Sequence, residues 1–118
     1  MKKLNELISI GIEVLKQEDK INEKFDGYIS SFGASLIYAG LLPTVIFYSR
    51  KGGAVEERQH IIEWIEKMLQ KQKNNGQFKL KEETISLYNS NKAADIVKLT
   101  REVREAAVAL KLALRVFI

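Results

Sequence analysis

The residues that could do acid–base, nucleophilic or metal chemistry are few and scattered. The chain of 118 residues has no cysteine and one histidine, His60, so thiolate chemistry and a histidine-based metal site or catalytic triad lack their side chains. A lone histidine on an amphipathic helix usually lies at the surface or boundary. The acidic pairs Glu56-Glu57 and Glu82-Glu83 fall at predicted helix starts, where the helix dipole favours carboxylates. We therefore predict that the protein is not an enzyme and uses no cofactor or metal.

A glycine-rich turn superficially resembles a phosphate cradle. Arg50-Lys51-Gly52-Gly53 precedes a predicted helix, and a helix start can bind an anion. The segment lacks the spacing of a P-loop and its Lys-Ser/Thr ending, and Glu56 and Glu57 already occupy the anion position. The pattern therefore favours an ordinary glycine turn.

The basic side chains are more informative, because they are unevenly distributed. The net charge is +4, yet residues 1–50 hold six basic and six acidic side chains, so the whole excess lies in the second half. Residues 67–81 contain five lysines, including Lys71 and Lys73, and no acid. Such a run could hold a nucleic-acid backbone, and Phe78 within it could stack a base.

The last predicted helix has two different sides. One side is an apolar stripe that predicts burial. The other gathers four cations within an arc of about 80°: Arg101, Arg104, Lys111 and Arg115. Apolar residues fall within or beside that arc: Val97, Val108, Leu112 and Val116. This face predicts contact with an anionic polymer, with a second subunit, or with both.

Helical spacing of apolar residues extends along the whole chain. It predicts helices over 2–18, 23–39, 43–51, 54–73, 81–89 and from 90 or 91 to the carboxyl terminus. Asp19 or Asn22 is the expected cap of the second helix, and Ser90 or Asn91 that of the last. We predict an all-α fold: a single compact helical domain, 1–118, of about five to six helices with a long C-terminal helix.

The stretch 27–49 carries no formal charge and is long enough to span a membrane. Gly40 and Pro43 interrupt it, which favours two short buried helices, with Gly40 in a left-handed conformation and Pro43 in the next first turn. A strand over 44–48 is the competing prediction for the second part. Small residues of 27–35 should let a neighbouring helix approach closely. The amino terminus does not read as a signal peptide, and we expect no membrane partner.

Two segments resemble the small subunit of type III-B (Cmr) CRISPR RNA-guided effector complexes. They are FGASLIYAGLLPTVIFYSRKGG (32–53) and LTREVREAAVALKLALRVFI (99–118). The family's features match Leu36-Ile37, Gly40-Leu41, Phe47, Lys51 and the end 110–118. A proline common near Gly33 and a tryptophan-containing ending are missing.

This resemblance implies a cytoplasmic, all-helical, non-catalytic protein of antiviral defence. Its implied partners are other subunits of the effector complex, guide RNA and target RNA, with possible self-association along the complex. We predict that the RNA backbone is held first by the four cations of the last helix and second by Arg50, Lys51, Lys71 and Lys73. A protein scaffold without nucleic-acid contact and a small DNA-binding regulator remain alternatives.

Overall fold

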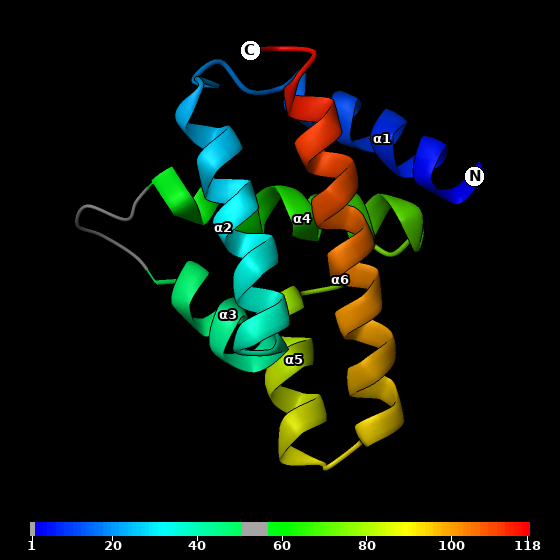
Figure 1. Ribbon diagram of the computed structural model, residues 1–118. Coiled ribbons are helices and arrows are strands. Elements are labelled where there is room, and N and C mark those ends of the chain that lie inside the picture. Colours follow the sequence, from blue (N-terminus) through cyan, green and yellow to red (C-terminus); the bar gives the residue numbers. More distant parts are fainter. Residues whose placement is uncertain (1, 51–56) are drawn as a thin grey trace.

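Six α-helices build the protein, in a computed structural model that describes residues 2–50 and 57–118 (Figure 1). They are α1 (Lys2–Leu15), α2 (Lys24–Tyr38), α3 (Leu41–Tyr48), α4 (Gln59–Gln72), α5 (Leu80–Asn89) and α6 (Ala93–Leu114). The described residues contain no strand, so the competing strand over 44–48 is wrong. The Cα radius of gyration, 13.5 Å, is what a compact chain of this length should have. The predicted all-α fold with a long last helix is confirmed.

α6 is the axis around which four of the other five helices of the described residues pack; α3 instead contacts α2, α4 and α5. α6 contacts α1 and α2 most extensively, and also α4 and α5. Figure 1 shows α1 beside its carboxyl-terminal part and α5 beside its amino-terminal part. Its buried stripe alternates alanine with larger residues, which lets neighbouring helices lie close: Leu99, Val103, Ala106, Ala107, Ala109, Leu110, Ala113 and Leu114.

α1 packs tightly against this axis at Gly11. A Cβ atom there would lie 3.1 Å from the Cβ of Ala113 and 3.3 Å from the Cε of Met68. Glycine is a poor helix former, but it is the residue that fits between these two helices. Gly11 therefore costs helix propensity and allows close packing of α1 on α4 and α6.

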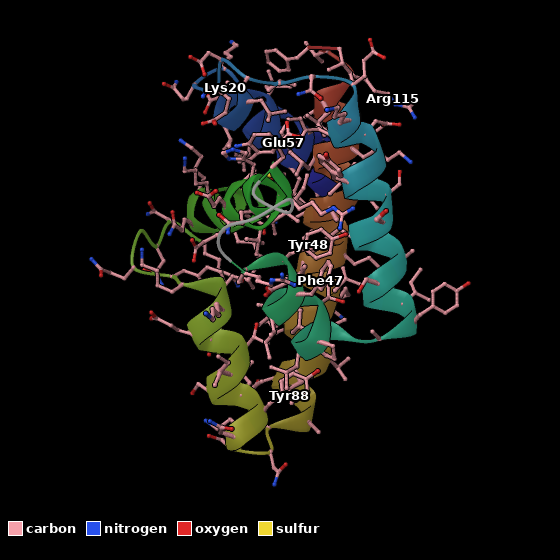
Figure 2. All side chains as sticks on the ribbon, turned by 90° about the vertical axis from the view of Figure 1, so that its left-hand side faces the viewer. Lys20, Phe47, Tyr48, Glu57, Tyr88 and Arg115 are labelled. Atoms are coloured by element: carbon pink, nitrogen blue, oxygen red, sulfur yellow. The ribbon has the colours of Figure 1, made fainter. Side chains whose placement is uncertain are left out.

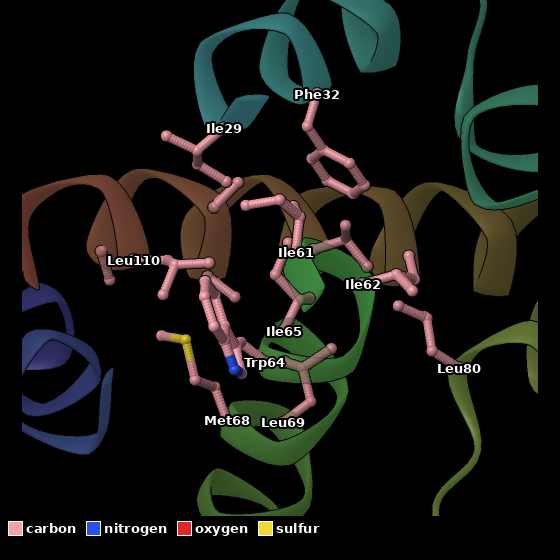
Figure 3. Packing of buried hydrophobic residues seen from close by; sticks show 14 of the residues in the cluster. Ile29, Phe32, Ile61, Ile62, Trp64, Ile65, Met68, Leu69, Leu80 and Leu110 are labelled. Carbon is pink, nitrogen blue, oxygen red and sulfur yellow. The ribbon is translucent and has the colours of Figure 1, made fainter. Parts of the chain in front are cut away.

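The core receives side chains from all six helices, and α4 supplies its largest one, Trp64. Figure 3 shows Trp64 beside Met68 of its own helix and Leu110 of α6. The ring of His60 stacks on Trp64 with centroids 5.5 Å apart, and its Nδ1 lies 3.4 Å from a carboxylate oxygen of Glu63. His60 thus occupies the core boundary, as the sequence predicted.

The corner between α2 and α3 is formed by Gly40. Its φ of 91° is positive, as the predicted left-handed conformation requires, and its ψ of 178° is extended. Only glycine adopts this combination readily. Pro43 lies in the first turn of α3, as predicted. The hydroxyl oxygens of Ser35 and Thr44 are 2.5 Å apart and tie the two helices together.

Several predicted details of the helices differ from the structure. Of the small residues of 27–35, Ser35 does contact a neighbouring helix, α3, but Gly27 is exposed and a Cβ on Gly27 or Gly33 would meet nothing within 4 Å. α1 ends at Leu15 and α6 at Leu114, earlier than predicted. The predicted start of the fourth helix at Ala54 lies outside the described residues.

The predicted caps are partly correct. The residue that directly precedes α2 is Glu23, without a side-chain cap, so neither Asp19 nor Asn22 is the cap itself. The side-chain oxygen of Asn22 nevertheless accepts a hydrogen bond from the backbone N–H of Lys24 at 2.9 Å, at the start of α2. Asn91 has a φ of 53° in the turn before α6, and the residue that precedes the helix is Lys92, without a side-chain cap. No helix among the described residues is both long and apolar enough to cross a membrane.

Candidate nucleic-acid interface

The side of α6 that faces away from the core carries the predicted row of cations. We call it the α6 outer face; it comprises Val97, Arg101, Arg104, Val108, Lys111, Leu112 and Arg115. Its cations are exposed except for the half-buried Lys111, and Val97 is 65% exposed. Arg101 and Arg115 are separated by about 21 Å along the helix axis. Arg115 directly follows the last turn, near the top of the molecule in Figure 2.

Two acids of α6 near this row are already paired with lysines of other elements, one in α1 and one in the turn after α4. Glu102 accepts hydrogen bonds from Nζ of Lys73 at 2.9 and 3.0 Å, and Glu105 lies 3.3 Å from Nζ of Lys3. Within residues 2–50 and 57–118, no ion pair involves a cation of the α6 outer face. The face therefore presents positive charge that the described part of the protein does not neutralise.

A narrow apolar groove of about 290 Å³ runs between α1 and the α6 outer face. Arg104 and Val108 form one side, and Leu4 and Leu7 contribute apolar surface from α1. The arrangement places an apolar slot beside the row of positive charges. Such a surface can hold an anionic backbone while shielding an apolar group from water.

Lys73 belongs to the protein's own packing. Besides pairing with Glu102, its ammonium lies 5.6 Å from the ring centre of Phe78, a favourable cation–π distance. Phe78 is only 8% exposed, so the prediction that its ring could stack a base is wrong. The structure therefore gives Lys73 a structural partner and removes the aromatic platform beside it.

The remaining predicted cations lie on other parts of the surface. Arg50 follows α3 and lines a hollow with Lys81. Lys51 lies outside the described residues. Lys71 is exposed in the last turn of α4, where the helix dipole favours a cation. The described candidates thus do not form one continuous interface with the α6 outer face.

Lys71 instead belongs to a polar basin that the sequence reasoning did not identify. The basin, of about 710 Å³, lies between the end of α1 and the turn after α4, and Lys16 and Lys67 also line it. Lys67 was visible as part of the lysine run. Lys16 could not be linked to it from the sequence, because only the packing of α1 on α4 brings it there.

The acidic pairs differ from each other in role. Glu82 and Glu83 occupy the first turn of α5, as predicted from the helix dipole. Glu57 precedes α4, so the prediction that it lies in that helix's first turn is wrong; its carboxylate accepts hydrogen bonds from the Tyr28 hydroxyl at 3.2 Å and the Asn22 amide at 3.4 Å. Glu56 lies outside the described residues. The described residues contain no cluster of three or more histidine or acidic side chains that could hold a metal ion.

Comparisons with known proteins agree with the resemblance found in the sequence. A family model described as CRISPR-associated protein (Cas_Cmr5) matches residues 7–113, which is most of the chain. No curated protein and no solved structure gives a significant match. The matched range includes parts of all six helices of the described residues. The chain therefore belongs to the Cmr5 family of CRISPR-associated proteins, the small subunits of type III-B (Cmr) complexes.

Proposed function

We propose that this protein is a non-catalytic subunit of the cytoplasmic Cmr effector complex that holds the backbone of guide or target RNA in antiviral defence. The α6 outer face is the contact surface, and the protein also helps to assemble the complex. The observation that carries the proposal is the row of four cations on α6, beside which Glu102 and Glu105 are engaged by lysines of other elements.

The chemistry of such a contact is electrostatic and independent of sequence. Arginine binds phosphate oxygens in a bidentate manner and lysine binds them as a point charge, and neither contact reads a base. In an RNA-guided complex, base pairing supplies the sequence recognition, so the protein needs only to hold the backbone. A rigid helix suits this role because it fixes the spacing of the charges along the strand.

The expected salt dependence follows from the number of phosphates contacted. Each phosphate neutralised on a single strand contributes about −0.7 to the slope of log affinity against log salt concentration. Four cations on the α6 outer face therefore give a slope of about −3 if all of them contact phosphates. The affinity should be similar for RNAs of unrelated sequence.

The experiment replaces two cations of the face together, Arg104→Glu with Lys111→Glu. RNA affinity, measured by fluorescence anisotropy with labelled single-stranded RNA, should fall at least tenfold, and the salt slope should become shallower by about 1.4, which corresponds to two phosphates. The control is Lys16→Glu with Lys71→Glu, because it lowers the net charge by the same amount in the polar basin, and its RNA affinity at physiological salt should fall threefold or less.

A second function is supported by the apolar residues of the same face. Val97, Val108 and Leu112 are all exposed, which is unusual for a helix that contacts nothing else. They favour a protein scaffold in which a neighbouring subunit covers the α6 outer face. If the double variant keeps its fold by circular dichroism and its RNA affinity is unchanged, the scaffold is the better explanation and the RNA contact is rejected.

A further inference from the structure

α3 has an unusual distribution of side chains, because it buries a polar residue and exposes apolar ones. Thr44 is fully buried together with Val45, whereas Ile46 is 50% exposed and Phe47 is 45% exposed. A surface helix normally turns its polar side to water. The sequence predicted a wholly buried helix here, and the structure buries only one side of it. The exposed side of α3 is therefore an apolar surface that requires an explanation.

The buried side of α3 is fixed and cannot rotate to hide the exposed side. Thr44 contacts Ser35 of α2, and the ring of Tyr48 packs edge-on against Phe32 with centroids 5.0 Å apart. Burial raises the pKa of the Tyr48 hydroxyl, and the positive charge of Arg58 partly opposes this rise. Rotation of α3 would expose these contacts, so Ile46 and Phe47 remain at the surface.

The exposed side of α3 lines a shallow hollow of about 690 Å³, which we call the α3 groove. Its surface is mainly apolar, and it is lined by Leu42, Pro43, Ile46, Phe47, Ser49, Arg50 and Lys81. Figure 2 looks onto this side of the molecule, where α3 lies in front of α6 and carries Phe47. The α3 groove is thus separate from the α6 outer face.

Two cations from different elements border this apolar surface. Arg50 follows α3, Lys81 lies in the first turn of α5, and both are exposed. Neither is part of an ion pair within the described residues. A fitting occupant would therefore combine apolar side chains for the groove with carboxylates for its cations.

We propose that the α3 groove binds a short amphipathic, acidic helix of a different protein subunit. The apolar residues of that helix would pack on Ile46 and Phe47, and its carboxylates would face Arg50 and Lys81. α3 is about 12 Å long, which matches two to three turns of a bound helix. An RNA backbone is a poorer occupant than at the α6 outer face, because only two cations border the α3 groove and phosphates over its apolar floor would lose water without enough positive charge to compensate. The inference rests on the proposed function, since it assumes that other subunits surround this protein.

The first experiment identifies the occupant by photo-crosslinking in the reconstituted Cmr complex. A benzoylphenylalanine replaces Phe47, and irradiation should link it to an acidic segment of another protein subunit, identified by mass spectrometry. The matched control carries the same group in place of Tyr38, which is 88% exposed on α2 outside the groove, and should not label that segment. A crosslink from position 47 to RNA or to a second copy of this chain would overturn the proposal.

The second experiment tests the charge of the occupant with Phe47→Glu and Phe47→Lys. Both remove the apolar ring, but only the glutamate repels an acidic helix. Incorporation of the Phe47→Glu variant into the complex should therefore fall at least tenfold relative to the wild type. This loss should be at least threefold larger than the loss for the Phe47→Lys variant. Equal incorporation of the two variants, or wild-type incorporation of both, contradicts the proposal.

The two proposals fail in different ways. RNA affinity of the free Phe47 variants, measured as for the α6 variants, should stay within threefold of the wild type, because the α3 groove lies apart from the α6 outer face. A loss of incorporation without a loss of RNA affinity therefore supports the assignment of the α3 groove to a protein partner, independently of the proposed RNA contact. A loss of RNA affinity in both Phe47 variants would instead show that this groove takes part in RNA binding and would reject its assignment to a protein.

Discussion

At the scale of single residues, Gly11 and Gly27 are both helical glycines with opposite surroundings. Alanine in place of glycine improves helix propensity by about 1 kcal/mol. At Gly27 the added methyl meets open space, so Gly27→Ala should raise the free energy of unfolding by about 1 kcal/mol. At Gly11 the added Cβ would lie 3.1 Å from the Cβ of Ala113. The cost of this overpacking should exceed the gain in helix propensity, so Gly11→Ala should lower the free energy of unfolding by about 1 kcal/mol. Urea unfolding followed by circular dichroism measures both values.

A double variant separates overpacking from other causes. Ala113→Gly removes the methyl group that Gly11→Ala would contact, so the two changes together should destabilise less than the sum of the single changes. Strict additivity of the two changes would mean that α1 and α6 are not in close contact at this point.

Single-residue roles that depend on packing could not be predicted from the sequence. Lys73 and Glu102 are 29 positions apart, and only the packing of α4 on α6 joins them. The lysine run therefore suggested an RNA contact for Lys73 when the residue has a partner inside the protein. Glu57 is similar, because its bonds connect the segment before α4 with Asn22, which precedes α2, and with Tyr28 in α2. Composition reveals such charges but not their partners.

At the scale of elements, the corner between α2 and α3 depends on the backbone of Gly40. Its combination of φ 91° and ψ 178° is essentially restricted to glycine and costs other residues about 1–3 kcal/mol. Gly40→Ala should therefore lower the free energy of unfolding by that amount, although a Cβ there would meet nothing within 4 Å. Gly33→Ala, in open space within α2, is the matched control and should not destabilise. Equal stability of the two variants in urea would contradict the role of the Gly40 backbone.

The helices themselves were predictable because their signals are local. Apolar spacing identified every helix, and the turn residue Gly40 located the break between α2 and α3. The side of α2 that contacts other helices was less predictable, since small residues suggest close approach whether or not a neighbour is present. α3 shows the same limit: its sequence is apolar on all sides, and only the packed structure shows which side remains exposed.

At the scale of the whole molecule, the positive excess is divided among separate surfaces. The α6 outer face, the α3 groove and the polar basin around Lys71 each present cations, and they are built from different helices. The sequence located the excess in the second half of the chain and identified the α6 outer face correctly as an exposed surface. It could not separate the other cations into groups, because Lys16 joins Lys71, and Arg50 joins Lys81, only after folding.

This division allows net charge to be distinguished from a specific contact surface. Each change of a lysine or arginine to glutamate alters the charge by two, so any double reversal takes the net charge from +4 to zero. Lys16→Glu with Lys71→Glu reverses the polar basin, and Arg104→Glu with Lys111→Glu reverses the α6 outer face to the same extent. If RNA is attracted only by the overall charge, the two double variants lose the same affinity.

We expect them to differ at physiological salt. There the screening length is about 8 Å, so charges outside the contact surface have little effect, and the basin variant should lose threefold or less while the α6 variant loses at least tenfold. At tenfold lower ionic strength screening weakens and the two losses should become more similar, because distant charges then contribute to the attraction. Anisotropy titrations at the two salt concentrations measure this difference. Equal losses at physiological salt would show that the α6 outer face has no special role, whatever its exposure.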